Sequence, residues 1–155
     1  MKKISLYILC LVCLVLAGCG SSKTKEVGSL DKFQSACVNN GFSYQDKLSE
    51  YQEKNITYIT GAILGSLDNT EIEMVVYDTP ESADKTQKQH IASFMNIKST
   101  GATAHKEKGK NYYKFTMVSN GYYMVSSRID NTLVFSKTLL ANKEKIENIL
   151  NEINY

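Results

Sequence analysis

Apolar and polar residues alternate along several stretches of the chain, and this alternation predicts most of its strands. The alternation is strong at residues 71–78, 111–118, 122–129 and 132–137, and weak at 103–106. Residues 56–66 instead form a run rich in β-branched and small side chains. Turn-forming residues separate neighbouring runs, most clearly Asn120-Gly121. The pattern therefore predicts a series of antiparallel hairpins.

Three other stretches carry apolar residues at helical spacing. The first follows the capping residue Ser29 and ends near Gly41, and the second begins at Thr79-Pro80 and runs to about residue 98. The third follows Asn142. Residues 43–55 are polar and rich in Gln, Glu and Lys, so we expect a connection there that includes at most a helical turn.

The predicted order of elements is helix, two strands, helix, three or four strands, helix. One side of the later strands is apolar and the other is mostly polar, as in an antiparallel sheet covered by helices on one face. We therefore predict a single α+β domain over residues 29–155, with five to six strands and three helices packed on one face. On the outer, polar face we expect Tyr112, Tyr122 and Arg128.

The N-terminal region follows a different pattern. Two lysines follow Met1, and residues 4–16 form an almost unbroken apolar run that is too short to span a bilayer. Small residues follow it, as at the cleavage point of a secretory signal. The tetrapeptide Leu16-Ala17-Gly18-Cys19 resembles the lipobox of bacterial lipoproteins, and the chain looks similar to small lipoproteins of low-GC Gram-positive bacteria.

This resemblance implies a diacylglyceryl group on the Cys19 thiol, cleavage before Cys19, and a mature chain tethered to the membrane on its extracytoplasmic side. We accordingly assign residues 1–18 to a signal peptide and residues 19–28 to the lipidated cysteine and a flexible tether. The mature chain then carries 16 basic and 16 acidic residues. This balance gives no electrostatic reason to expect a nucleic-acid partner.

Few residues of the mature chain suggest catalysis. Apart from Cys19, Cys37 is the only thiol left, and its helical spacing from Leu30 and Phe33 predicts a buried, inert side chain. A nucleophile formed by Cys37 and His90 is the alternative interpretation. The sequence shows neither a cluster of metal ligands nor a nucleotide-binding glycine pattern, so we expect no metal and no cofactor.

These observations favour a non-enzymatic surface lipoprotein that binds an extracytoplasmic protein, a peptide or an envelope component. Tyr and Arg contribute much of the energy of many interfaces, so Tyr112, Tyr122 and Arg128 are the candidate binding residues. Two alternatives stay open. One is a small surface enzyme that uses Cys37 and His90, and the other is a structural or assembly lipoprotein of an envelope complex.

Overall fold

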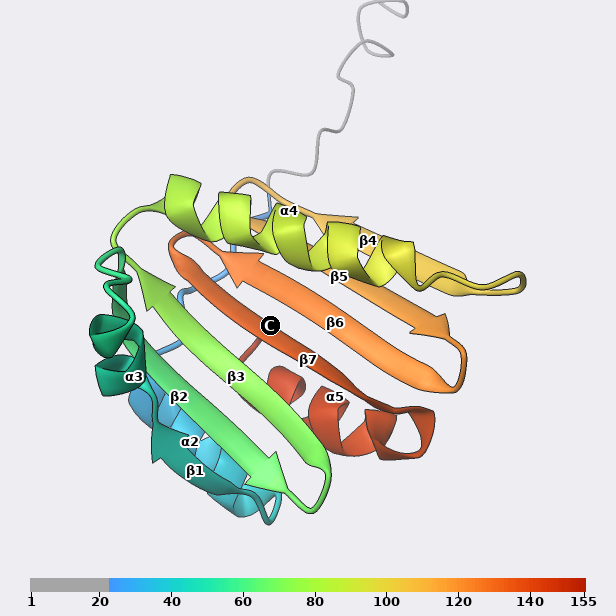
Figure 1. Cartoon of the computed structure of the whole chain (residues 1–155), viewed down its shortest axis with the longest axis horizontal. Helices are drawn as coiled ribbons and strands as arrows, with labels where there is room; N and C mark the ends of the chain where they lie inside the picture. The colour runs from blue at the N-terminus through green and yellow to red at the C-terminus, as the bar shows by residue number, and fades with distance from the viewer. Residues whose placement is uncertain (1–22) are drawn as a thin grey trace, which may run out of the picture.

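The computed structural model describes residues 23–155 (Figure 1). The predicted signal peptide and the predicted lipidation site at Cys19 lie outside these residues. Within them, no helix is long and apolar enough to cross a membrane.

Seven strands and four α-helices make up the described part of the chain. The helices are α2 (Leu30–Asn39), α3 (Leu48–Glu53), α4 (Pro80–Asn96) and α5 (Lys143–Glu152), the last preceded by a short 3₁₀ turn over Leu140–Asn142. The strands are β1 (Ser43–Asp46), β2 (Ile59–Leu67), β3 (Thr70–Tyr77), β4 (Thr103–Lys108), β5 (Tyr112–Ser119), β6 (Tyr122–Ile129) and β7 (Thr132–Leu139).

Two helices begin at the capping residues that the sequence predicts. The Ser29 hydroxyl accepts a hydrogen bond from the backbone N–H of Lys32 at 3.2 Å, and the Thr79 hydroxyl accepts one from that of Ser82 at 3.1 Å. Each bond satisfies a backbone donor that the first turn of a helix leaves free. At the end of α2, Gly41 adopts a φ of 79°, which glycine reaches without strain.

The strands form one antiparallel sheet in the order β1-β2-β3-β7-β6-β5-β4. This order is symmetric about β7, because a helix followed by three strands lies on each side: α2 with β1, β2 and β3, and α4 with β4, β5 and β6. The two helices cover opposite faces of the sheet (Figure 1), and they contact different strands: α2 packs on β1 and β2, and α4 packs on β6, β7 and β3.

Helices cover both faces of the sheet. On one, the α2/α5 face, Phe33 and Ile146 pack with Met74 and Val134 in a single large core. On the other, the α4 face, two smaller clusters form. One joins Ala83 to strands β2, β3 and β7 and to α3, and the other joins Phe94 to strands β5 and β6.

The α+β class and the antiparallel sheet are confirmed, but three details of the prediction are wrong. The sheet has seven strands and not five to six, the described helices number four and not three, and they do not share one face. Strand β1 was missed because its four residues are all exposed and do not alternate, and α3 because it has six residues. Adjacent residues of a strand point to opposite faces, so a sheet covered on both faces buries both of them. Met124 and Val125 are both buried, and so are Leu133 and Val134.

Candidate functional site

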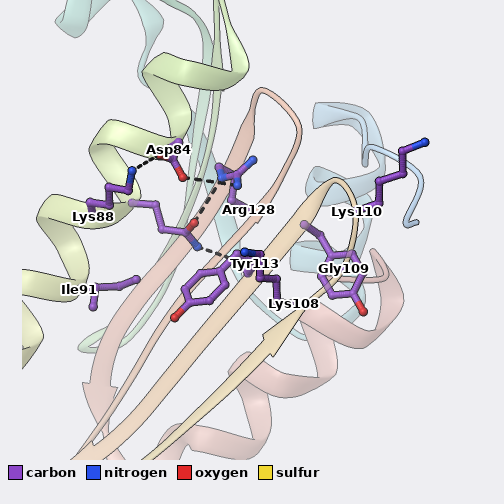
Figure 2. A pocket seen from close by; sticks show the side chains of 10 residues that line it. Asp84, Lys88, Ile91, Lys108, Gly109, Lys110, Tyr113 and Arg128 are labelled. Atoms are coloured by element: carbon purple, nitrogen blue, oxygen red, sulfur yellow. Dashed lines mark hydrogen bonds and ion pairs between the residues drawn. The ribbon is translucent and has the colours of Figure 1, made fainter. Parts of the chain in front are cut away.

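A basic pocket lies on the α4 face, between α4 and the turn that joins β4 to β5. Its volume is about 460 Å³. Figure 2 shows Asp84, Lys88 and Ile91 on the α4 side of it, the turn residues Lys108–Lys110 on the opposite side, and Arg128 and Tyr113 between them. Gln87 and Tyr112 complete the lining.

Arg128, the only arginine of the chain, is fixed in this pocket from three directions. Its Nη2 lies 3.5 Å from the Asp84 carboxylate, its Nε donates to the Gln87 side-chain oxygen at 3.3 Å, and its Nη1 donates to the backbone carbonyl of Asp130 at 3.2 Å. Its side chain is 16% exposed. A guanidinium has five N–H donors, so two of those of Arg128 have no partner in the described part of the chain.

Gln87 holds this arrangement together from α4. Its side-chain nitrogen donates to two strand carbonyls, that of Tyr113 at 2.8 Å and that of Ser126 at 3.1 Å, while its oxygen accepts from Arg128. The side chain is almost completely buried. No pattern in the sequence indicated that Gln87 would orient the arginine.

Positive charge dominates the pocket. Four cationic side chains line it against a single carboxylate, that of Asp84, which also pairs with Lys88 at 2.6 Å. Lys108 and Lys110 form no ion pair among the described residues, and Figure 2 shows Lys110 extending away from Arg128. An arginine with free donors among uncompensated lysines is an arrangement suited to a carboxylate or phosphate group.

The segment 23–28 docks beside this pocket without forming a helix or strand. The backbone of Lys25 exchanges two hydrogen bonds with the Asn111 side chain, at 3.0 and 2.9 Å, and the carbonyl of Lys23 accepts from the backbone N–H of Lys110 at 2.9 Å. A Cβ atom at Gly109 would lie 2.1 Å from the Tyr112 ring and 2.5 Å from the Lys23 carbonyl, so this close approach requires glycine. The second half of the expected tether is therefore part of the folded domain.

A second cavity, of about 250 Å³, lies at the C-terminal half of α4 and includes His90, Glu73 and Phe135. The centre of the His90 ring lies 4.2 Å from that of Phe135, and burial lowers the pKa of His90. The buried Nδ1 has no hydrogen-bond partner among residues 23–155. Burial raises the pKa of Glu73, which accepts a hydrogen bond from the Tyr51 hydroxyl at 2.8 Å. The mainly apolar packing of His90 fits a structural role.

Cys37 and His90 do not meet. Cys37 lies on α2 in the core of the α2/α5 face, completely buried, whereas His90 lies on α4 on the opposite side of the sheet. Burial, followed by the charge of Glu152, raises the pKa of the Cys37 thiol to about 12. The prediction that Cys37 is buried is confirmed, and the Cys37–His90 pair is not formed.

The three candidate binding residues do not share one face, so this part of the prediction is wrong. In the register of β5 and β6, Tyr112 pairs with Ile129 and Ser119 pairs with Tyr122. Directly paired residues point to the same side, so Tyr112 faces the α2/α5 side with Ile129, and Tyr122 faces the α4 side with Arg128. Because the Asn120-Gly121 turn has two residues, each even-numbered residue of β5 pairs with an odd-numbered residue of β6. Even-numbered residues of the two strands therefore face opposite sides of the sheet, whereas the sequence interpretation placed them on the same side.

The two tyrosines also differ in burial. Tyr112 is 5% exposed and packs beneath the Lys25 ammonium, 4.8 Å from its ring centre. Tyr122 is 38% exposed and lies at the far end of the sheet, paired with the exposed Leu139. Tyr112 and Arg128 both line the basic pocket, but the Tyr112 side chain belongs to the core of the α2/α5 face, so Arg128 alone of the three directs a charged group toward the pocket. Over residues 23–155, no three His, Cys, Asp or Glu side chains are grouped to hold a metal ion.

No family model and no curated protein matches this chain. Two solved structures resemble its backbone. A GTP-binding regulator from Thermotoga maritima is 17% identical, with a TM-score of 0.45, over 85% of this chain and 92% of that one. The extracellular domain of PknH from Mycobacterium tuberculosis is 9% identical, with a TM-score of 0.36, over 81% of this chain and 91% of that one. Similarities at this level say nothing about function.

Proposed function

We propose that this protein is a lipid-anchored, non-enzymatic binding module on the extracytoplasmic side of a membrane, and that the basic pocket is its binding site. The observation that carries the proposal is Arg128, fixed by three partners while keeping free donors in a pocket of excess positive charge. The partner is then a protein, peptide or envelope component that presents an anionic group.

The lipid anchor is supported by the charge, the apolar run and the lipobox-like tetrapeptide ending at Cys19. A binding role is also favoured over catalysis by Cys37 and His90, because the sheet separates these two side chains. The thiol of Cys37 is moreover held in its protonated form, since its pKa is raised to about 12.

Substitution of Cys19 tests the anchor. We expect Cys19→Ala to abolish both membrane association and labelling with palmitate, because two acyl chains, at about 0.8 kcal/mol per buried CH₂, supply the anchorage. Fractionation of cells that express each form measures this. A Cys19→Ala protein that stays in the membrane fraction and still incorporates palmitate would show that the lipoprotein assignment is wrong.

Capture from solubilised membranes tests the binding site. The native lipoprotein is compared with Arg128→Lys, which keeps the positive charge and loses the planar fork of donors. We expect capture of the partner to be lost in Arg128→Lys. The melting temperature should also fall, because the bonds to Gln87 and Asp130 are lost, so capture is compared at a temperature at which both forms are folded. Equal capture by both forms would remove the pocket from the proposed function.

A further inference from the structure

The basic pocket lies close to the proposed lipid anchor. Lys23 is bonded through its carbonyl to the backbone of Lys110, at the rim of the pocket. Cys19 stands four residues before Lys23, and four residues of fully extended chain span at most about 14 Å. A lipid on Cys19 would thus hold this rim within about two headgroup layers of the bilayer surface.

Positive charge is concentrated at the same corner of the molecule. Lys23, Lys25, Lys108 and Lys110 gather around the β4–β5 turn. Within residues 23–155, only Lys25 of these four forms an ion pair, at 3.9 Å from Glu107. The mature chain as a whole is balanced in charge, so this concentration results from the fold. Lysines at such a position are attracted to the negative surface of an anionic membrane.

Inside the rim, the pocket combines groups that suit a phosphate ester. Arg128 offers its remaining donors as a planar fork, and Lys88 and Lys108 add positive charge. Ile91 and Tyr113 provide an apolar wall next to these charges, which suits the carbon atoms that adjoin a headgroup phosphate.

We propose that the basic pocket binds the phosphate of an anionic phospholipid headgroup in the membrane to which the protein is anchored. This inference rests on the proposed function, because it requires the lipid on Cys19. The anchor holds the pocket against a high local concentration of headgroups, so a modest intrinsic affinity suffices for occupancy. The bound headgroup would fix the orientation of the domain on the bilayer, with β5 leading from the membrane toward Tyr122 and the exposed Leu139.

The single arginine provides a selective probe. The mature lipoprotein, labelled with ¹⁵N-arginine, has one Nε–H resonance, that of Arg128. In detergent micelles it is titrated with phosphatidylglycerol, with phosphatidylcholine, and with soluble glycerol 3-phosphate. We expect a saturable shift of the resonance with phosphatidylglycerol, and little change with the other two at the same concentration.

Matched variants locate the site. Lys108→Gln combined with Lys110→Gln should weaken the phosphatidylglycerol effect about 10- to 30-fold. Lys54→Gln combined with Lys145→Gln removes the same charge from exposed positions outside the pocket and should leave it unchanged. Equal weakening in both double variants would show general attraction of charge and overturn the proposal.

Two further outcomes would overturn it. A stronger shift with glycerol 3-phosphate than with phosphatidylglycerol would assign the pocket to a soluble phosphorylated ligand, and the absence of any shift would show that it binds no phosphate. Mass spectrometry of the same sample reports whether Cys19 is acylated. A lipidated protein without a shift therefore refutes only the headgroup, whereas an unmodified Cys19 refutes the proposed anchor.

Discussion

The two faces of the sheet differ in how completely they are closed. On the α2/α5 face, two helices pack side by side and enclose one continuous apolar core. On the α4 face, one long helix and the short α3 leave two separate clusters, and both cavities described above open on this face. A smaller cavity, of about 230 Å³, opens on the α2/α5 face beside Lys114 and Glu147. The apolar core of this face is nevertheless continuous, whereas that of the α4 face is interrupted by polar groups.

Polar residues divide the α4 face between its two clusters. Gln87, Ser126 and Arg128 lie where apolar side chains would otherwise join the clusters, and the Gln87 amide is bonded to strand carbonyls. Buried polar groups cost stability unless they are hydrogen-bonded. Buried polar residues also occur on the α2/α5 face, for example Ser127 and Thr132, but there they do not interrupt the apolar core.

The largest contrast between the faces should appear when buried and pocket-lining isoleucines are truncated. Ile149 is completely buried on α5. Ile149→Ala should lower the free energy of unfolding by about 2–5 kcal/mol, because a cavity remains in a closed core. Ile91 lies at the edge of the basic pocket. Ile91→Ala should lower the free energy of unfolding by less than about 1.5 kcal/mol, since solvent fills the space that the side chain leaves. Urea unfolding of both variants measures this, and equal losses would contradict the distinction between the faces.

Substitutions of Cys37 test how tightly the α2/α5 face is packed. Cys37→Ser places a hydroxyl in an apolar core and should cost about 1–3 kcal/mol in unfolding free energy, while Cys37→Ala should be milder. Strand β2 approaches so closely that a Cβ at Gly65 would lie 2.6 Å from the Cys37 sulphur. The native thiol should therefore react slowly with a thiol reagent at neutral pH, and rapid labelling of the folded protein would show that this face opens.

Tyr112 and Tyr122, which the sequence interpretation assigned to one surface, allow the two faces to be compared with the same substitution. Tyr112→Ala should lower the melting temperature by several degrees, because its ring is buried against Gly109 and under Lys25. Tyr122→Ala should leave it nearly unchanged, since its ring is partly exposed at the end of the α4 face. Thermal unfolding of the two variants gives the comparison, and similar melting temperatures would contradict the burial difference.

The smallest effect concerns pH and the α4 face. Because burial lowers the pKa of His90, the unfolded chain binds a proton more readily than the folded protein as the pH falls below the ordinary value of 6.5. Stability should therefore decrease between pH 7.5 and about pH 5.5. The raised pKa of Glu73 acts in the opposite direction above its ordinary value of 4.5. The difference between wild type and His90→Gln isolates the histidine, and a difference that does not change with pH would show that His90 is not desolvated.

The sequence was sufficient to predict elements whose signal is local. Thr79 and Pro80 mark the start of α4, Asn120-Gly121 marks the β5–β6 hairpin, and the stripe containing Cys37 predicts its burial. Strand β1 carries no such signal, because an exposed edge strand depends on its pairing with β2 and not on its own pattern. Of the candidate site, the sequence interpretation named Arg128 and Tyr112 but neither Asp84 nor Gln87, which lie more than forty positions before Arg128 in the chain.

The sequence by itself determined the α+β class, the antiparallel hairpins, the burial of Cys37 and the lipobox-like start of the chain, because each depends on residues within one turn or one strand of each other. Only the tertiary structure decided which face each strand residue points to, that helices cover both sides, and that Lys23 docks against Lys110 beside Arg128. These features depend on register and on contacts between distant segments. A shift of one residue in register exchanges the faces of a whole strand, and this is why Tyr112 and Tyr122, similar in the sequence pattern, lie on opposite sides of the sheet.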